Sequence, residues 1–367
     1  MGYQHQVQFR DFKEEQYIHS LFQLTLSPGN ACEAVAYAGS LTSDQRSQFL
    51  EMANSHHVVL RALQPILQQA TLAGNTELAA WVATVIEKEN ARIGTAVRYL
   101  HEICAEVEAA GCPVTVMKSL DHWPDLGNDL DLYSSADIRR VGGVLKEKFN
   151  ARMEPRSWGD RLAGKWNFAI PGLPESVEFH LQRLGQTGEH TRLAQRFITR
   201  RVEKEISGMK FYVPAPEERI VVATLQRMYR HFYFRVCDIV NNTALVESGE
   251  LDYFELRRAT ESAGIWEGAA TFLVIVSDYV RRYRGYNLNL PINVSETAPF
   301  GGEKIRIRER FLRVPIMPEG ARLFTREITH AALHGDLPAT LRLNLLPPLA
   351  VAAAVAYKLT GSDKGVW

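Results

Sequence analysis

Two aspartates separated by a single leucine, Asp129 and Asp131, follow a loop that contains proline and glycine. On a β-strand alternate side chains point to the same face, so both carboxylates would face one way while Leu130 and Leu132 face the core. A buried pair of like charges is costly unless a cation or hydrogen bonds compensate it. The spacing therefore indicates a ligand-binding pair, although an aspartate that ends a strand and caps the next helix would give the same pattern.

A third acid follows on a second segment with strand-like alternation, VEFHLQ at 177–182. There Glu178 and His180 share one face, and the apolar residues share the other. If the two segments are neighbours in a sheet, the carboxylates of Asp129, Asp131 and Glu178 converge. Such a cluster suits hard divalent cations with oxygen ligands, and two cations held in this way can bind a triphosphate for in-line displacement at phosphorus.

The turn before the aspartates completes a larger pattern. Lys118 and Ser119 precede Asp129 by a short loop. A turn, then a D-x-D strand and then an acid on a later strand resemble the signature of the polymerase-β-like nucleotidyltransferases. Within that superfamily the chain is most similar to a bacterial group with a Lys-Gly turn, a DxDL strand and a later acidic–apolar–His strand. The likeness covers residues 114–183. Ser119 stands where the bacterial group has glycine, so close backbone approach to a phosphate is less readily achieved.

The resemblance implies an α/β core that transfers a nucleoside monophosphate from an NTP to a hydroxyl-type acceptor and releases pyrophosphate. Asp129 and Asp131 would bind two Mg²⁺ ions, and Glu178 would complete the acceptor-side metal site and orient or deprotonate the nucleophile. By the same resemblance Ser119 would contact the β- and γ-phosphates. The nucleotide-binding residues would be Lys118, Ser119, Lys165 and His180.

Two other classes of function remain open on the sequence. In the first, the nucleotidyltransferase fold is kept without its chemistry and serves as a scaffold for a nucleotide or a protein partner, which the altered turn at Ser119 favours. In the second, the protein is a helical interaction module in which the D-x-D only caps a helix. The acceptor, the preferred NTP and the oligomeric state are not determined by the sequence.

Hydrophobic periodicity predicts an α+β protein, with a small mixed β-sheet core flanked by helical regions. Residues 1–95 read as helical, including one helix through 45–63. Residues 96–213 form the predicted nucleotidyltransferase-like core, and 214–367 are mainly helical, with a connecting segment at 301–314. The core strands are predicted at 114–117, 130–133, 166–170 and 177–182, with a helix over about 136–149 that Ser135 caps.

Composition narrows the class of partner. The 367 residues carry 42 basic and 42 acidic side chains, so no overall field favours nucleic acid or an anionic membrane. The four cysteines have neither paired nor zinc-ligand spacing, and no targeting pattern begins the chain, which predicts a cytoplasmic protein. The longest apolar run, at 345–357, is too short for a transmembrane segment and predicts a buried terminal helix.

Two histidine pairs and two basic segments are predicted to have structural and not catalytic roles. His56 and His57 are adjacent on a predicted helix and are expected at the surface. His330 and His334 are four residues apart without the glutamate of a zinc-protease motif, which favours an exposed or capping pair. The basic segments at 196–204 and 304–313 are predicted to be solvated faces.

Overall fold

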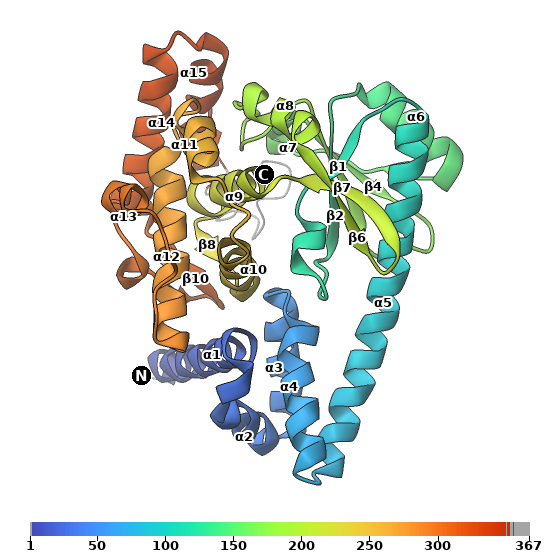
Figure 1. The fold of residues 1–367 in the computed structure, drawn as a ribbon, viewed down its shortest axis with the longest axis vertical. Helices are drawn as coiled ribbons and strands as arrows, with labels where there is room; N and C mark the ends of the chain where they lie inside the picture. Colours follow the sequence, from blue (N-terminus) through green and yellow to red (C-terminus); the bar gives the residue numbers. More distant parts are fainter. Residues whose placement is uncertain (1, 350, 353–354, 356–367) are drawn as a thin grey trace.

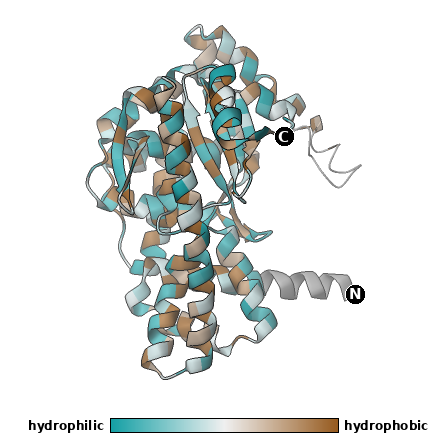
Figure 2. Ribbon diagram, turned by 90° about the vertical axis from the view of Figure 1, so that its right-hand side faces the viewer, coloured by the Kyte–Doolittle hydropathy of each residue, from teal (hydrophilic) through white to brown (hydrophobic). Residues whose placement is uncertain are grey.

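The structure is a computed structural model, and it describes residues 2–349, 351–352 and 355. The protein is a mixed α/β protein in which a small mixed sheet is surrounded by helices. Figure 1 shows helices of the N-terminal region below the sheet and the C-terminal helices beside it. Helices coloured by hydropathy carry both hydrophobic and hydrophilic residues, as expected for elements that bury one face (Figure 2).

The N-terminal region consists of helices, as the sequence predicts. They are α1 (Gly2–Leu26), α2 (Cys32–Ser40), α3 (Ser43–Ser55), α4 (Val59–Leu72) and α5 (Thr76–Ala109). The predicted helix over 45–63 is broken into α3 and α4, because His57 has a positive φ of 53° that a continuous helix does not allow. The prediction that His56 and His57 lie at the surface is wrong, since both are buried where the chain turns.

The central sheet has the strand order β1-β2-β5-β4-β3. Strands β2 and β5 are parallel, and every other neighbouring pair is antiparallel. Helix α6 (Ile138–Phe149) lies where it was predicted, but Asp137 and not Ser135 caps it. The strands are β1 (Val114–Val116), β2 (Asp129–Ser134), β3 (Arg152–Met153), β4 (Lys165–Ala169) and β5 (Ser176–Leu181).

A short helix, a longer helix and a hairpin complete the core region. They are α7 (Trp158–Ala163), α8 (Thr191–Thr199), and the antiparallel pair β6 (Arg201–Ile206) and β7 (Met209–Pro214). Leu130, Leu132, Val177 and Phe179 are fully buried in one hydrophobic cluster with residues of α5 and α6. The apolar faces of β2 and β5 thus lie in the core, as the alternation predicts.

The C-terminal region is helical with one small sheet. Its helices are α9 (Pro216–Thr224), a π-helix (Leu225–Arg230), α10 (Val236–Glu247), α11 (Tyr253–Glu261), α12 (Trp266–Arg284), α13 (Ile292–Thr297), α14 (Ala321–Leu333) and α15 (Leu337–Leu343). The segment at 301–314, predicted to connect, instead forms β9 (Arg306–Arg308) and β10 (Phe311–Arg313), and β10 pairs with both β9 and β8 (Tyr233–Phe234).

The apolar run at 345–357 departs from its predicted burial where it is described. Residues 346–349, 351–352 and 355 are helical, but Val351 and Val355 are 64% and 51% exposed. The other positions of the run lie outside the described residues. In the described part of the chain, no helix combines the length and the apolar character needed to cross a membrane.

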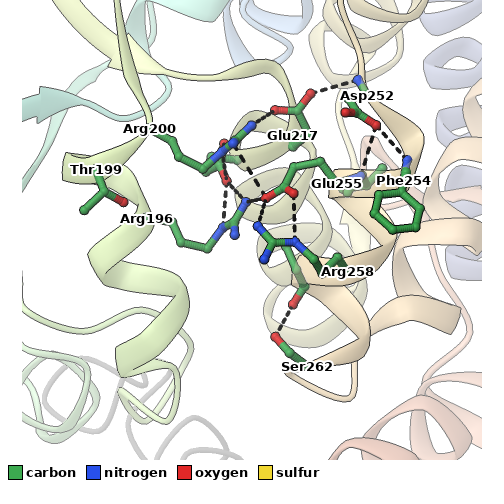
Figure 3. A network of polar contacts seen from close by, with 12 residues as sticks. Arg196, Thr199, Arg200, Glu217, Asp252, Phe254, Glu255, Arg258 and Ser262 are labelled. Carbon is green, nitrogen blue, oxygen red and sulfur yellow. Dashed lines mark hydrogen bonds and ion pairs between the residues drawn. The ribbon is translucent and has the colours of Figure 1, made fainter.

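Ion pairs with buried glutamates join α8 to the C-terminal helices (Figure 3). Arg196 Nε donates to Glu218 Oε1 at 2.7 Å, and its Nη2 donates to Glu255 Oε1 at 2.6 Å. Arg200 Nη2 donates to Glu217 Oε2 at 2.7 Å. The prediction that 196–204 is a solvated face is therefore wrong for these two arginines, because the glutamates they neutralise come from α9 and α11.

The buried histidines predict how stability should depend on pH. His56 Nδ1 accepts from the Val236 N–H, and its Nε2 donates to the Arg310 carbonyl, which assigns the neutral tautomer. Burial lowers the pKa of His56 to about 3, and burial also lowers the pKa of His57 and His122 well below the usual range. Below the unfolded pKa of about 6.5 only the unfolded chain takes up these protons, so folding stability is lost as pH falls.

We therefore expect the free energy of unfolding to decrease from pH 7.5 to 5.5, by up to ~1.4 kcal/mol per pH unit for each such histidine. Urea unfolding at both pH values measures this slope. His56→Gln should reduce the slope by about one proton. A slope that is unchanged in the variant would contradict the assignment of His56 as neutral in the folded state.

Candidate functional site

The parallel pairing of β2 and β5 places two of the predicted acids side by side. Asp131 is opposite Glu178 in the register, and Asp129 is opposite Ser176. One ligand atom from each of Asp131, Glu178 and His180 lies within 4.8 Å of the others. Asp129 shares this face by strand parity but is exposed, and it does not belong to that close group. The structure therefore brings together an Asp–Glu–His cluster with the third predicted acid at its margin.

Two lysines compensate the buried carboxylates. Lys118 Nζ lies 2.8 Å from Asp131 Oδ1, and Lys165 Nζ lies 2.6 Å from Glu178 Oε2. His180 Nε2 contacts the other Glu178 oxygen at 2.7 Å. Lys118 follows β1 and Lys165 begins β4, so the sheet delivers one cation to each acid from opposite sides. Both lysines predicted to bind nucleotide thus reach the candidate site.

Burial and neighbouring charges shift the pKa values in this site. Burial raises the pKa of Asp131, an effect that Lys118 opposes. Burial would also raise the pKa of Glu178, but His180 and Lys165 outweigh it and hold that pKa well below its usual range. Although Asp129 reaches solvent, the surrounding protein partly excludes water from it and so raises its pKa, and the charge of Glu178 raises that pKa further. Glu178 is therefore the carboxylate that this site holds most firmly in its ionised form.

Ser119 acts on the aspartates through their backbone. It is 1% exposed, and its hydroxyl accepts from the Asp131 N–H at 2.8 Å and donates to the Asp129 carbonyl at 3.2 Å. The hydroxyl therefore fixes the turn to the first residues of β2. The contact with a phosphate that the resemblance implies for Ser119 stays a prediction.

We expect Ser119→Ala to lower the free energy of unfolding by about 1–3 kcal/mol, because the buried Asp131 N–H loses its acceptor. Ser176→Ala is the matched control: Ser176 is on the neighbouring strand, and its hydroxyl has no hydrogen-bond partner. That variant should change stability little. Equal losses from the two substitutions in urea unfolding would show that the hydroxyl of Ser119 does not support β2.

The structure adds residues to the site that the sequence interpretation did not assign to it. The π-helix Leu225–Arg230 presents Gln226 and Arg230 to a small cavity of about 40 Å³ that Lys118 and His180 also line. Together with burial, the positive charge of Arg230 lowers the pKa of Lys165. π-Helical turns are rare and frequently occur at functional sites. The run of basic and aromatic residues at 229–235 is the sequence signal for this segment.

Comparisons with models of known families, with characterised proteins and with solved structures gave no match. The class of this protein must therefore be argued from its fold and site.

Proposed function

We propose that the protein is a Mg²⁺-dependent nucleotidyltransferase that moves a nucleoside monophosphate from an NTP to a hydroxyl-type acceptor. The observation that carries the proposal is the register of β2 and β5, which sets Asp131 beside Glu178 on the polar face of a mixed sheet. The Lys118-Ser119 turn lies at the same place and is bonded to β2. Residues 114–183 resemble the nucleotidyltransferases in the order of a turn, a D-x-D strand and a later acid. The arrangement of these three parts supports the proposal.

The residues present are compatible with a divalent cation. Asp131, Glu178 and His180 already have ligand atoms within 4.8 Å of one another, and the buried Asp131 Oδ1 faces Lys118 Nζ at 2.8 Å. Carboxylate oxygens are the protein ligands that Mg²⁺ prefers. When bound, the cation would neutralise the carboxylates and polarise a phosphoryl oxygen. Asp131, Glu178 and Asp129, which share one face, would supply the oxygen ligands, and His180 would stay beside Glu178 without binding the ion.

The lysines would then change partners. Lys118 and Lys165 now neutralise Asp131 and Glu178, and a cation on these carboxylates would free both ammonium groups for the phosphates of a nucleotide. Arg230 and Gln226 approach the same place from the π-helix. The cavity between them has room for a few water molecules and not for a nucleoside, so a nucleoside bound in this cavity would require the π-helix and the sheet to separate.

Glu178 is better suited to binding and orienting than to accepting a proton. An efficient general base has a pKa near the working pH, whereas the pKa of Glu178 is held well below its usual range. We assign Glu178 the role of a ligand that also orients the acceptor hydroxyl. His180, whose pKa is lowered by burial, is neutral at pH 7 and contacts Glu178 through Nε2.

A second candidate, a catalytically silent scaffold that binds a nucleotide or a partner, is favoured by the same lysines. Lys118 and Lys165 compensate the acids without any added cation, so the fold does not need a metal to tolerate them.

Pyrophosphate release from each of the four NTPs, with and without Mg²⁺ and with a panel of hydroxyl acceptors, separates the two candidates. The enzyme should release pyrophosphate only with Mg²⁺. The scaffold would show a nucleotide-induced thermal shift without turnover. A protein that neither binds nor consumes any NTP would refute the nucleotidyltransferase proposal.

A further inference from the structure

A second group of potential metal ligands lies away from the sheet site. Glu189 and His190 end the loop that follows β5, and Glu327 projects from α14. All three side chains are at least nine-tenths buried, with exposures of 7%, 8% and 2%. The nucleotidyltransferase proposal uses none of them. Two buried carboxylates and an imidazole from distant parts of the chain therefore require a separate explanation.

The spacing of the three side chains matches a single coordination sphere. His190 Nε2 lies 2.9 Å from Glu327 Oε1 and 3.8 Å from Glu189 Oε1, and ligand atoms of all three are within 4.8 Å of one another. With metal–ligand distances of ~2.0–2.2 Å, tetrahedral geometry separates two ligands by roughly 3.3 Å. The observed pairs lie on either side of that value. His190 Nε2 and Glu327 Oε1 face each other, and beyond this mutual contact neither atom has a hydrogen-bond partner among the described residues.

The loop holds Glu189 and His190 in place. The Glu189 carboxylate accepts from the Gln186 N–H at 3.1 Å, the Thr187 N–H at 2.8 Å and the Thr187 hydroxyl at 2.9 Å. The backbone of His190 pairs in both directions with Leu184. At Gly185, with a φ of +91°, a Cβ would lie 2.1 Å from Glu189 Oε1, so the turn closes directly on the carboxylate. Groups that orient ligands in this way are typical of metal sites.

The cluster opens onto a cavity of about 360 Å³ between the loop and α14. His330 and His334, whose stacked rings are 3.9 Å apart, lie on the same cavity, together with Asp336. Arg342 lies nearby, and its guanidinium donates to the Leu162 and Thr187 carbonyls, while Arg192 also lines the cavity. A fourth coordination position could therefore be filled from the cavity by water or a small anion.

We propose that Glu189, His190 and Glu327 bind one divalent transition-metal ion of the Zn²⁺ class, with an open coordination position toward the cavity. The imidazole selects against Mg²⁺, which requires near-octahedral oxygen ligands, and it suits Zn²⁺ and its first-row neighbours. The ion would link the core loop to α14 and so join the two regions of the chain. This proposal is independent of the nucleotidyltransferase activity.

The competing explanation is a metal-free ion pair. Burial would lower the pKa of His190, but Glu327 and Glu189 outweigh it and raise that pKa, so a protonated His190 could neutralise one glutamate by itself. One protonated His190 would leave the second buried carboxylate of the group without a compensating charge from that histidine. A divalent cation compensates both carboxylates.

The test is a Zn²⁺ titration of the full-length protein in excess Mg²⁺, followed by competition with a chromogenic chelator. The wild type should bind one Zn²⁺ tightly, and Zn²⁺ should raise its unfolding midpoint by mass action. Glu327→Gln and His190→Gln each remove a ligand at nearly constant size. Loss of a residue that only supports a metal ligand weakens binding by up to about 100-fold. Loss of a ligand itself should therefore weaken Zn²⁺ binding by about 100-fold or more.

Two matched variants separate this site from others on the same chain. Asp131→Asn disables the sheet cluster, and His334→Gln disables the exposed histidine pair; both should retain tight Zn²⁺ binding. Binding that is lost in His334→Gln and kept in Glu327→Gln would assign the ion to the surface pair and overturn the proposal. X-ray absorption of the Zn²⁺-loaded wild type is a test that does not depend on a variant folding. One imidazole with oxygen ligands is expected. Sulfur ligands, several imidazoles or the absence of Zn²⁺ binding would overturn the proposal.

Discussion

Asp131→Asn should abolish the Mg²⁺-dependent stabilisation of the protein by nucleotides and lower any transfer activity by roughly 10²–10³-fold, the usual cost of removing one preorganised charge from an active site. The substitution keeps the size of the side chain, so Leu130 and Leu132 should remain packed. It removes one negative charge and one cation ligand from the close group with Glu178 and His180. Thermal unfolding with Mg²⁺ and each NTP, together with pyrophosphate release, measures both effects.

The same variant should lose about 1–3 kcal/mol of stability without ligands, because Lys118 no longer has its carboxylate partner. Nucleotide-induced shifts must therefore be compared with the ligand-free midpoint of each variant. Asp137→Asn is the charge-matched control, since Asp137 only caps α6 and asparagine caps equally well. If Asp131→Asn retained the nucleotide response of the wild type, Asp131 would not be part of a nucleotide site.

Asp125→Ala should destabilise the protein by about 3–5 kcal/mol, the range expected when one partner of a buried ion pair is removed. Asp125 lies in the loop before β2, is 1% exposed, and accepts from the Leu60 N–H at 2.6 Å and from Arg61 Nε at 2.7 Å. Burial raises the pKa of Asp125, an effect that Arg61 and the backbone donors oppose. The intact pair therefore contributes little net stability, but its loss leaves the Leu60 N–H without its acceptor and the Arg61 charge without a carboxylate. Among the described residues, Arg61 then keeps only the neutral acceptors Asn241 Oδ1 and the His57 carbonyl.

Urea unfolding of Asp125→Ala against Asp137→Ala isolates this effect. Both aspartates accept backbone N–H groups at the start of a helix, but Asp137 is exposed to solvent and has no buried arginine. Its replacement should cost only about 1 kcal/mol. The double variant Asp125→Ala/Arg61→Ala should recover part of the loss, because no unpaired charge remains. Similar losses at the two positions, or no recovery, would argue against a costly unpaired Arg61.

The strands of the core could be predicted from the sequence because their side chains alternate cleanly. The 130–133 and 177–182 segments each place apolar residues on one face, and the structure buries that face. The break between α3 and α4 could not be predicted in the same way. It depends on the buried bonds of His56 to Val236 and Arg310, residues that are distant in the sequence.

The sequence predicts the acidic residues of the candidate site but not the residues that surround them. Strand parity places Asp131 and Glu178 on one face, and only the parallel register sets them opposite each other. The pairing of Lys118 with Asp131 and the approach of Arg230 depend on how separate elements pack, for which sequence spacing gives no signal. The prediction of a solvated face at 196–204 is wrong for the same reason, since the glutamates that pair with Arg196 and Arg200 lie on α9 and α11.

Helix α5 runs without interruption from Thr76 to Ala109, from its pairing with α4 to the edge of the sheet. Its 34 residues form a rod about 50 Å long, and no loop separates its two halves. A tilt of about 5° at one end of such a rod displaces the other end by roughly 4 Å. Helix α5 therefore joins the N-terminal helices to the sheet without a flexible joint, so a rotation of the helix at one end would be carried to the other.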